Sequence, residues 1–140
     1  MWFLYAFLSA IAAALVAIFG KLGLSKIDTT LATTLRSVIM AVFLLAMAVS
    51  FRSFHGFSLQ SLTNKQWLYI VLAGIAGALS WLAYFAALKV GAASKVVAID
   101  RTSVIFVLIF SILTLGEVLT WKSALGAALM TGGAILMTIK

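Results

Sequence analysis

Five stretches of the chain are each long and apolar enough to cross a lipid bilayer, and together they account for most of its length. A helix rises 1.5 Å per residue, so about 20 apolar residues span the hydrocarbon core. These runs are rich in Ala and Leu and lack the two-residue alternation of a membrane-spanning strand. We therefore predict an all-α integral membrane protein, with one transmembrane domain over residues 1–140. Its five predicted transmembrane helices are residues 2–22, 31–51, 67–88, 95–115 and 123–139.

The composition excludes several other classes of protein. Hydrophobic residues make up 65% of the chain and charged residues 9%, whereas a soluble domain carries about 25% charged residues. The chain has no cysteine and only one histidine, His55, so we predict no metal site and no cofactor. The net charge of +7 comes from basic residues that flank the helices, where they contact lipid head groups. We therefore predict a lipid environment and no nucleic-acid partner.

Capping residues indicate where several of the predicted helices begin and end. Asp28 is a favourable N-cap for the second helix. Thr63 and Gln66 have the spacing of a capping box before the third helix. Thr120 is placed to cap the fifth helix, and Gly116 to end the fourth. The short connections between most helices predict that consecutive helices are antiparallel neighbours.

Small residues four positions apart recur along the last predicted helix. One stripe contains Ser123, Ala127 and Thr131, and an offset stripe contains Ala124, Ala128 and Gly132. Such stripes let membrane helices approach closely. The pattern is compatible with packing inside one chain and with packing against a second copy, and the sequence does not decide between them.

The basic residues are distributed unevenly over the two membrane faces that five spans define. The face of the N-terminus holds Arg52, Lys65 and Lys122. This face has three basic residues and the opposite face has five. The bias is small, and it favours an outside N-terminus and an inside C-terminus. It is compatible with one fixed orientation and with insertion in both orientations. The opposite face holds Lys21, Lys26, Lys89, Lys95 and Lys140.

Three charged residues lie inside the predicted spans, namely Arg36, Asp100 and Arg101. Each costs at least a few kcal/mol at mid-membrane unless it is paired or hydrated. Arg36 lies eight residues beyond Asp28, roughly 12 Å along its helix, and Asp100 lies six beyond Ser94, roughly 9 Å along. Since both helices start at the same membrane face, an Arg36–Asp100 salt bridge is geometrically reasonable.

This trio supports two interpretations. Arg36 and Asp100 form a structural pair that sets the helix register, or all three residues line a polar cavity and bind or couple to a solute. One Asp with two Arg leaves a positive charge, which favours a carboxylate or phosphate on the solute. Asp100 is the only acid well inside the spans and thus the candidate for proton coupling.

A second set of candidate residues lies in the third predicted helix. Trp81, Tyr84 and Phe85 share one helical face, and Ser80 is adjacent. An aromatic face with polar tips can wall a binding cavity, and it can equally pack in the core or contact lipid. We include Ser80, Trp81 and Tyr84 among the candidate substrate-binding residues.

Several of these stretches together resemble an EamA domain of the drug/metabolite transporter superfamily. They are residues 80–88, residues 91–101, the Leu115-Gly116-Glu117 sequence, and the later Gly126 and Gly132. Arg36 also resembles a recurrent arginine of that family. Relatives commonly have proline where Ala98 stands, and this chain contains no proline, so its sequence predicts no kink there.

The resemblance implies a transporter of small organic metabolites, typically an exporter, in the plasma (inner) membrane. It also implies that the chain corresponds to one half of a ten-helix carrier built from inverted repeats. We accordingly predict an antiparallel homodimer that works by alternating access. The alternatives are a flippase component for a phosphate-bearing lipid carrier and a non-transporting membrane subunit. No set of residues suits an enzyme active site, so we predict no enzymatic activity.

Overall fold

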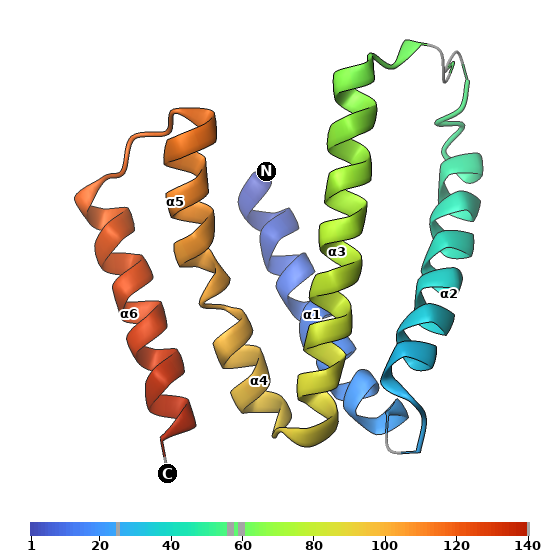
Figure 1. The fold of residues 1–140 in the computed structure, drawn as a ribbon. Coiled ribbons are helices and arrows are strands. Elements are labelled where there is room, and N and C mark those ends of the chain that lie inside the picture. Colours follow the sequence, from blue (N-terminus) through green and yellow to red (C-terminus); the bar gives the residue numbers. More distant parts are fainter. Residues whose placement is uncertain (25, 56–57, 59–60, 140) are drawn as a thin grey trace. The chain divides into compact units, whose positions relative to one another are not determined.

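Helices make up nearly all of the structure (Figure 1). The computed structural model describes residues 1–140 except 25, 56–57, 59–60 and 140. Over those described residues the chain forms α-helices and no β-strand, which confirms the all-α prediction. In chain order the helices are α1 (Trp2–Gly23), α2 (Thr29–Ser50), α3 (Asn64–Val90), α4 (Ala93–Asp100), α5 (Ser103–Leu115) and α6 (Trp121–Thr138).

The fourth predicted helix, residues 95–115, is two helices in the structure. α4 ends at Asp100 and α5 begins at Ser103, and together they form the membrane-length segment Ala93–Leu115, which confirms the predicted span. An apolar run predicts that a segment crosses the membrane, but it does not predict whether the backbone hydrogen bonds continue through it. The other four helices begin and end within three residues of their predicted bounds.

The lengths and surfaces of these helices fit a lipid bilayer. Within the described part of the chain, α1, α2, α3 and the combined segment Ala93–Leu115 are long and apolar enough to cross a membrane. α6 has 18 residues and begins with the more polar Trp121-Lys122-Ser123. Large apolar side chains point outward, and Phe43 and Leu113 are 62% and 75% exposed. Acyl chains, unlike water, solvate such a surface without penalty.

Side-chain caps start two helices where the sequence predicts them. The Asp28 carboxylate accepts hydrogen bonds from the backbone N–H of Thr30 at 2.9 Å and of Leu31 at 3.1 Å. The bond from Leu31 is the main reason that the pKa of Asp28 lies below its ordinary value of 3.8. Thr63 and Gln66 form the reciprocal capping box, with 2.8 Å from Thr63 N to Gln66 Oε1 and 3.3 Å from Gln66 N to Thr63 Oγ1.

The turn between α5 and α6 also follows the predicted signals. Gly116 ends α5 in the left-handed conformation at φ 67°, which a residue without Cβ adopts at no steric cost. Thr120 caps α6 by accepting the backbone N–H of Ser123 at 3.2 Å. These confirmed caps depend on residues next to each other in sequence, which is why the sequence is sufficient to predict them.

The chain divides into two compact units. Unit 1 contains residues 1–21 and 90–140, and unit 2 contains residues 22–89. In unit 1, Lys21 Nζ donates to the Gly91 carbonyl at 2.9 Å. In unit 2, Lys89 Nζ donates to the Ile27 carbonyl at 3.1 Å. Each lysine thus joins the end of one helix to a connection elsewhere in its own unit.

Each unit has a small buried core. In unit 2 the most buried side chains are Leu24, Thr33, Phe85 and Leu88, the last fully buried. In unit 1 they are mostly small, namely Ala17, Ala98, Ser111, Ala127 and Ala134. Small side chains bring the helix backbones close together, and α4 packs against α6 in this way.

Candidate functional site

Arg36 is stacked on an aromatic face inside the membrane-spanning part of unit 2. Its guanidinium carbon lies 3.7 Å from the centroid of the Trp81 ring and 5.2 Å from that of Phe85. The side chain is half-buried. A desolvated cation–π contact of this kind contributes about 2 kcal/mol. The aromatic rings therefore offset part of the cost of a cation at this depth.

The antiparallel arrangement of α2 and α3 brings these two residues to the same level. Lys89 at the end of α3 donates to the Ile27 carbonyl, next to the Asp28 cap that begins α2. Arg36 lies eight residues after Asp28, and Trp81 lies eight residues before Lys89. Equal spacing along two antiparallel helices gives equal depth. The sequence contains this signal, but our sequence analysis did not use it.

The aromatic residues of α3 form a connected cluster. The Trp81 and Phe85 rings are stacked with centroids 5.5 Å apart, and Tyr84 meets Trp81 edge-on at 5.6 Å. Phe85 is only 3% exposed, so it is a core residue, whereas Trp81 and Tyr84 are half-buried. Ser80, also a candidate, is exposed. The structure thus brings Arg36, Trp81 and Tyr84 into one group in unit 2.

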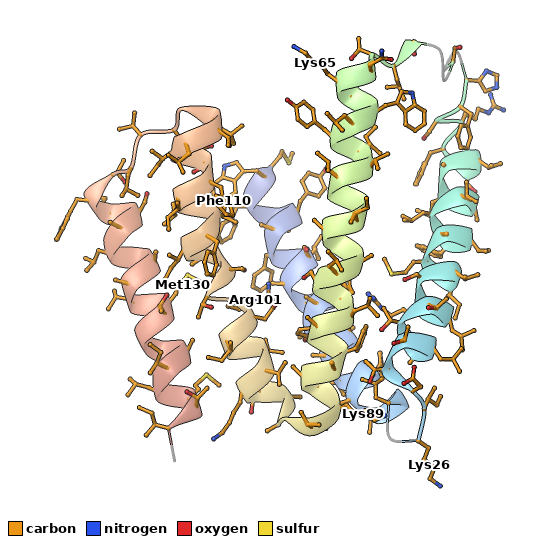
Figure 2. All side chains as sticks on the ribbon, in the orientation of Figure 1. Lys26, Lys65, Lys89, Arg101, Phe110 and Met130 are labelled. Carbon is orange, nitrogen blue, oxygen red and sulfur yellow. The ribbon has the colours of Figure 1, made fainter. Side chains whose placement is uncertain are left out.

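Asp100 and Arg101 lie where the membrane span of unit 1 is interrupted. Arg101 lies at the junction of α4 and α5 (Figure 2). Here the backbone N–H of Thr102 donates to the Ile99 carbonyl at 2.9 Å, and that of Val104 to the Arg101 carbonyl at 3.2 Å. These are three-residue rather than four-residue steps, so the α-helix tightens into a short 3₁₀ turn.

The interruption has a local cause that is not proline. The Thr102 hydroxyl donates to the Ile99 carbonyl at 2.7 Å and so supports the tightened turn. In a regular α-helix the Thr102 N–H would bond to the Ala98 carbonyl, and here it bonds to Ile99 instead. The turn therefore changes the hydrogen-bond partner of a backbone N–H group close to Asp100, the acid that lies well inside the spans. Asp100 and Arg101 are both exposed.

The predicted Arg36–Asp100 salt bridge joins residues of different units, and it stays a prediction. What the structure describes is two separate groups of charged residues. Arg36 is held by aromatic rings in unit 2, and Asp100 and Arg101 flank a helix interruption in unit 1. Among the described residues no group of three His, Cys, Asp or Glu side chains is placed to hold a metal ion.

A third feature, which the sequence analysis missed, is a buried hydroxyl on α6. Thr131 Oγ1 is buried and, within the described ranges, has no hydrogen-bond partner. It lies on the α6 face that contains Ala127 and Ala134, whereas Ala128 and Gly132 of the offset stripe are exposed. Lys95 of α4 donates to the Thr138 carbonyl on the same helix at 3.1 Å. Ala127 and the Thr131 hydroxyl of the first small-residue stripe are therefore buried within unit 1, whereas Ser123 of that stripe is exposed.

Comparison with known proteins shows to which family the chain belongs. The model of the EamA-like transporter family matches residues 1–139. The chain belongs to this family. A protein of Sinorhizobium sp named "Uncharacterized transporter in cobO 3'region" is 38% identical over 138 residues, which cover 99% of this chain and 96% of that protein. No solved structure matches the chain.

Membership of the EamA-like transporter family identifies a membrane transporter of the drug/metabolite transporter superfamily. It also confirms the predicted fold class, a helical half-unit of a ten-helix transporter. The membrane-length helices of the structure agree with this class. A transporter acts by binding a solute and changing conformation, so the charged residues of the spans become the candidates for that binding.

Proposed function

We propose that this chain carries small organic anions across the plasma membrane as an exporter, working as an antiparallel homodimer by alternating access. The observation that carries the proposal is the Arg36 guanidinium, held 3.7 Å over the Trp81 ring within a membrane-spanning helix. A cation at this depth is costly and is normally found at a functional site. Membership of a transporter family indicates solute binding as that function.

The stacking of Arg36 limits how a solute can approach. The guanidinium carbon lies over the indole ring, and the N–H groups of a guanidinium point outward within its own plane. A carboxylate or phosphate accepts two parallel hydrogen bonds from that edge. Trp81 and Tyr84 would offer an aromatic wall to the apolar part of the solute. We therefore favour small organic anions as the substrate class.

Asp100 and Arg101 would serve the conformational cycle. Irregular backbone inside a membrane is typical of transporters at the point where a helix has to bend. Asp100 is an acid beside such a point, so its protonation would change the charge at the interruption. We assign Asp100 to proton coupling and Arg101 to the same polar region.

The inverted-repeat architecture of the family supports the proposed homodimer. Residues 1–140 contain one five-span unit, whereas the inverted-repeat architecture needs two units of opposite orientation. The Sinorhizobium relative is of nearly the same length, since this chain covers 96% of it. A second copy inserted the other way up would supply the missing half.

Transport by the purified chain in proteoliposomes tests the proposal. Organic acids, amino acids and cationic drugs are offered under a proton gradient, and initial uptake rates are compared. We expect uptake of organic acids, which falls at least about tenfold in Arg36→Gln because a charge-assisted bidentate contact is lost. Arg36→Lys keeps the charge but loses the two parallel N–H donors of the guanidinium, so we expect an intermediate uptake rate.

Lys26→Arg is the matched control, because it changes a basic side chain in an exposed connection without changing the charge. It should transport at the parental rate. Organic-acid uptake by Arg36→Gln at the parental rate would contradict the anion site. Translocation of a phosphate-bearing lipid instead of soluble acids would support the flippase alternative. No transport of any solute by a folded, reconstituted chain would indicate a non-transporting subunit.

A further inference from the structure

The basic residues on one membrane face occupy positions that the local backbone disfavours. They are Arg52, at the end of α2, Lys65, at the start of α3, and Lys122, at the start of α6. By the order of the spans they lie on the same face. Each position opposes its residue for a physical reason that can be named.

Arg52 adopts a backbone conformation that favours glycine. Its φ is 51°, and among the described non-glycine residues it is the one with positive φ. Its N–H donates to the Val49 carbonyl at 3.0 Å, and the N–H of Ser53 donates to the Ala48 carbonyl at 2.9 Å. This pair of bonds is a Schellman motif with Arg52 at the position usually taken by glycine. An L side chain there is strained.

The end of α5 shows the usual solution to the same problem. Gly116 takes the left-handed position at φ 67°, where the absence of Cβ removes the strain. Arg52 performs the same turn at a cost that glycine would avoid. The side chain of Arg52 is therefore placed there for a reason other than the turn itself.

Lys65 and Lys122 oppose the dipoles of their helices. Lys65 is the second residue of α3 and Lys122 the second residue of α6, and neither helix has an acidic residue in its first turn. The N-terminus of a helix carries partial positive charge, so a nearby ammonium group is repelled. Lys65 lies at one end of α3 and Lys89 at the other (Figure 2).

Three of the five lysines of the opposite face are supported by local structure, whereas Lys26 is exposed in a connection. Lys21 and Lys89 are in the last turns of α1 and α3, where the helix dipole favours a cation. The ammonium groups of Lys21, Lys89 and Lys95 also donate to backbone carbonyls of their own units. Local structure explains these lysines and does not explain Arg52, Lys65 or Lys122. Lys140 lies outside the described residues.

We infer that Arg52, Lys65 and Lys122 are placed for their charge, which offsets the lysines of the opposite face and lets the chain insert in both orientations. Basic residues near the ends of spans set orientation, because they are retained on the inner side of the membrane. The inference rests on the proposed antiparallel homodimer, which needs both orientations in one membrane. It identifies the residues that keep the two orientations balanced. Their cost is backbone strain at Arg52 and an unfavourable helix dipole at Lys65 and Lys122.

Cysteine labelling of the whole chain in spheroplasts measures the orientation. The chain has no cysteine, so Val118→Cys and Ala92→Cys report the two faces without changing any charge, and both positions are exposed. An impermeant thiol reagent should label a fraction of each variant in the parental background. Arg52→Gly should raise the outside fraction of Val118→Cys, with about a fivefold change in the ratio of the two orientations.

Charge-matched variants separate charge from strain. Arg52→Lys keeps both the charge and the left-handed backbone, so it should leave the ratio unchanged. Lys65→Gln and Lys122→Gln should shift the ratio in the direction of Arg52→Gly, and Lys26→Gln, on the other face, should shift it the opposite way. Arg52→Gly should also raise the thermal stability of the purified chain, which shows that the variant folds.

Two results would overturn the inference in distinguishable ways. In the first, the parental chain is labelled from both sides, but Arg52→Gly leaves the ratio of the two orientations unchanged, as Arg52→Lys does. The role of Arg52, Lys65 and Lys122 in balancing the orientations is then refuted, while the dimer proposal stands. If each parental reporter is labelled from one side only, the chain has a single orientation. The antiparallel homodimer then fails, and the inference fails with it.

Discussion

α2 and α3 accommodate a membrane charge without losing their regularity, whereas the α4–α5 segment accommodates its charges at a break in the helix. In the first region Arg36 is stacked on Trp81 and partly covered by Phe85. In the second, Asp100 and Arg101 flank a 3₁₀ turn supported by the Thr102 hydroxyl. A cation can be stabilised by aromatic faces because they supply electron density without needing hydrogen bonds.

The difference indicates that the chain contains two kinds of charged group. Arg36 lies on a continuous helix, whereas Asp100 and Arg101 lie at an interruption. A stacked guanidinium on a continuous helix keeps its position, which suits selective binding of an anion. A carboxylate beside an interrupted hydrogen-bond ladder sits where the backbone is easiest to rearrange. We therefore propose solute binding for the first region and conformational coupling for the second. Two experiments test this contrast, and a third compares a buried hydroxyl in each unit.

The largest expected effect is that of removing the aromatic support. Trp81→Ala should lower the free energy of unfolding by about 3 kcal/mol, because it deletes buried ring surface and leaves Arg36 without its cation–π partner. Reversible unfolding in mixed micelles measures the change. Trp67→Ala, in the exposed start of α3, is the matched control and should cost less than 1 kcal/mol. Equal losses for both variants would show that Trp81 gives Arg36 no special support.

Hydrogen exchange tests the contrast between a continuous and an interrupted span. The backbone amides of residues 102–105 should exchange on the order of tenfold faster than those of residues 36–39, because the tightened turn opens at lower free energy. Exchange mass spectrometry of the chain in nanodiscs gives both rates in one sample. Slower or equal exchange at residues 102–105 would mean that the interruption is as stable as a regular helix, and the adaptable role would be lost.

The smallest expected effect concerns two buried threonines. Thr33 in unit 2 donates its hydroxyl to the Thr29 carbonyl at 2.7 Å, whereas the buried Thr131 hydroxyl in unit 1 has no hydrogen-bond partner among the residues that the structure describes. Thr131→Val should therefore stabilise the chain by about 1 kcal/mol, since it removes an unsatisfied polar group while nearly keeping the shape. Thr33→Val should not stabilise it. A stability loss in Thr131→Val would reveal a partner that this hydroxyl needs.

The predictions from sequence were most accurate where the cause is local. Asp28, Thr63 with Gln66, and Thr120 cap the helices that the sequence assigns to them. A capping side chain bonds to backbone only two or three residues away, so its geometry is contained in a short stretch of chain. The position of the spans was also predictable, because it depends on the total apolar content of a window rather than on packing.

The candidate site was predictable only as a set of residue types. Arg36, Trp81 and Tyr84 were selected as charged or aromatic residues inside spans, but the partner of Arg36 was missed. Its contact with Trp81 depends on the antiparallel register of two helices. The interruption at Arg101 was not predicted either, because it depends on the competing hydrogen bond of the Thr102 hydroxyl and not on a proline.

The amino-acid sequence alone determined that this chain consists of membrane-length helices, where most of those helices begin, and which charges lie within them. Those properties depend on the transfer of side chains into lipid and on bonds between near neighbours. Only the tertiary structure decided that Arg36 rests on Trp81, that the Thr131 hydroxyl is buried without a partner in the described part of the chain, and that the fourth span is divided into α4 and α5. The placements of Arg36 and Thr131 depend on which faces of distant helices meet. The division between α4 and α5 depends on which of several nearby carbonyls each backbone donor reaches. An apolar sequence determines these choices only through packing.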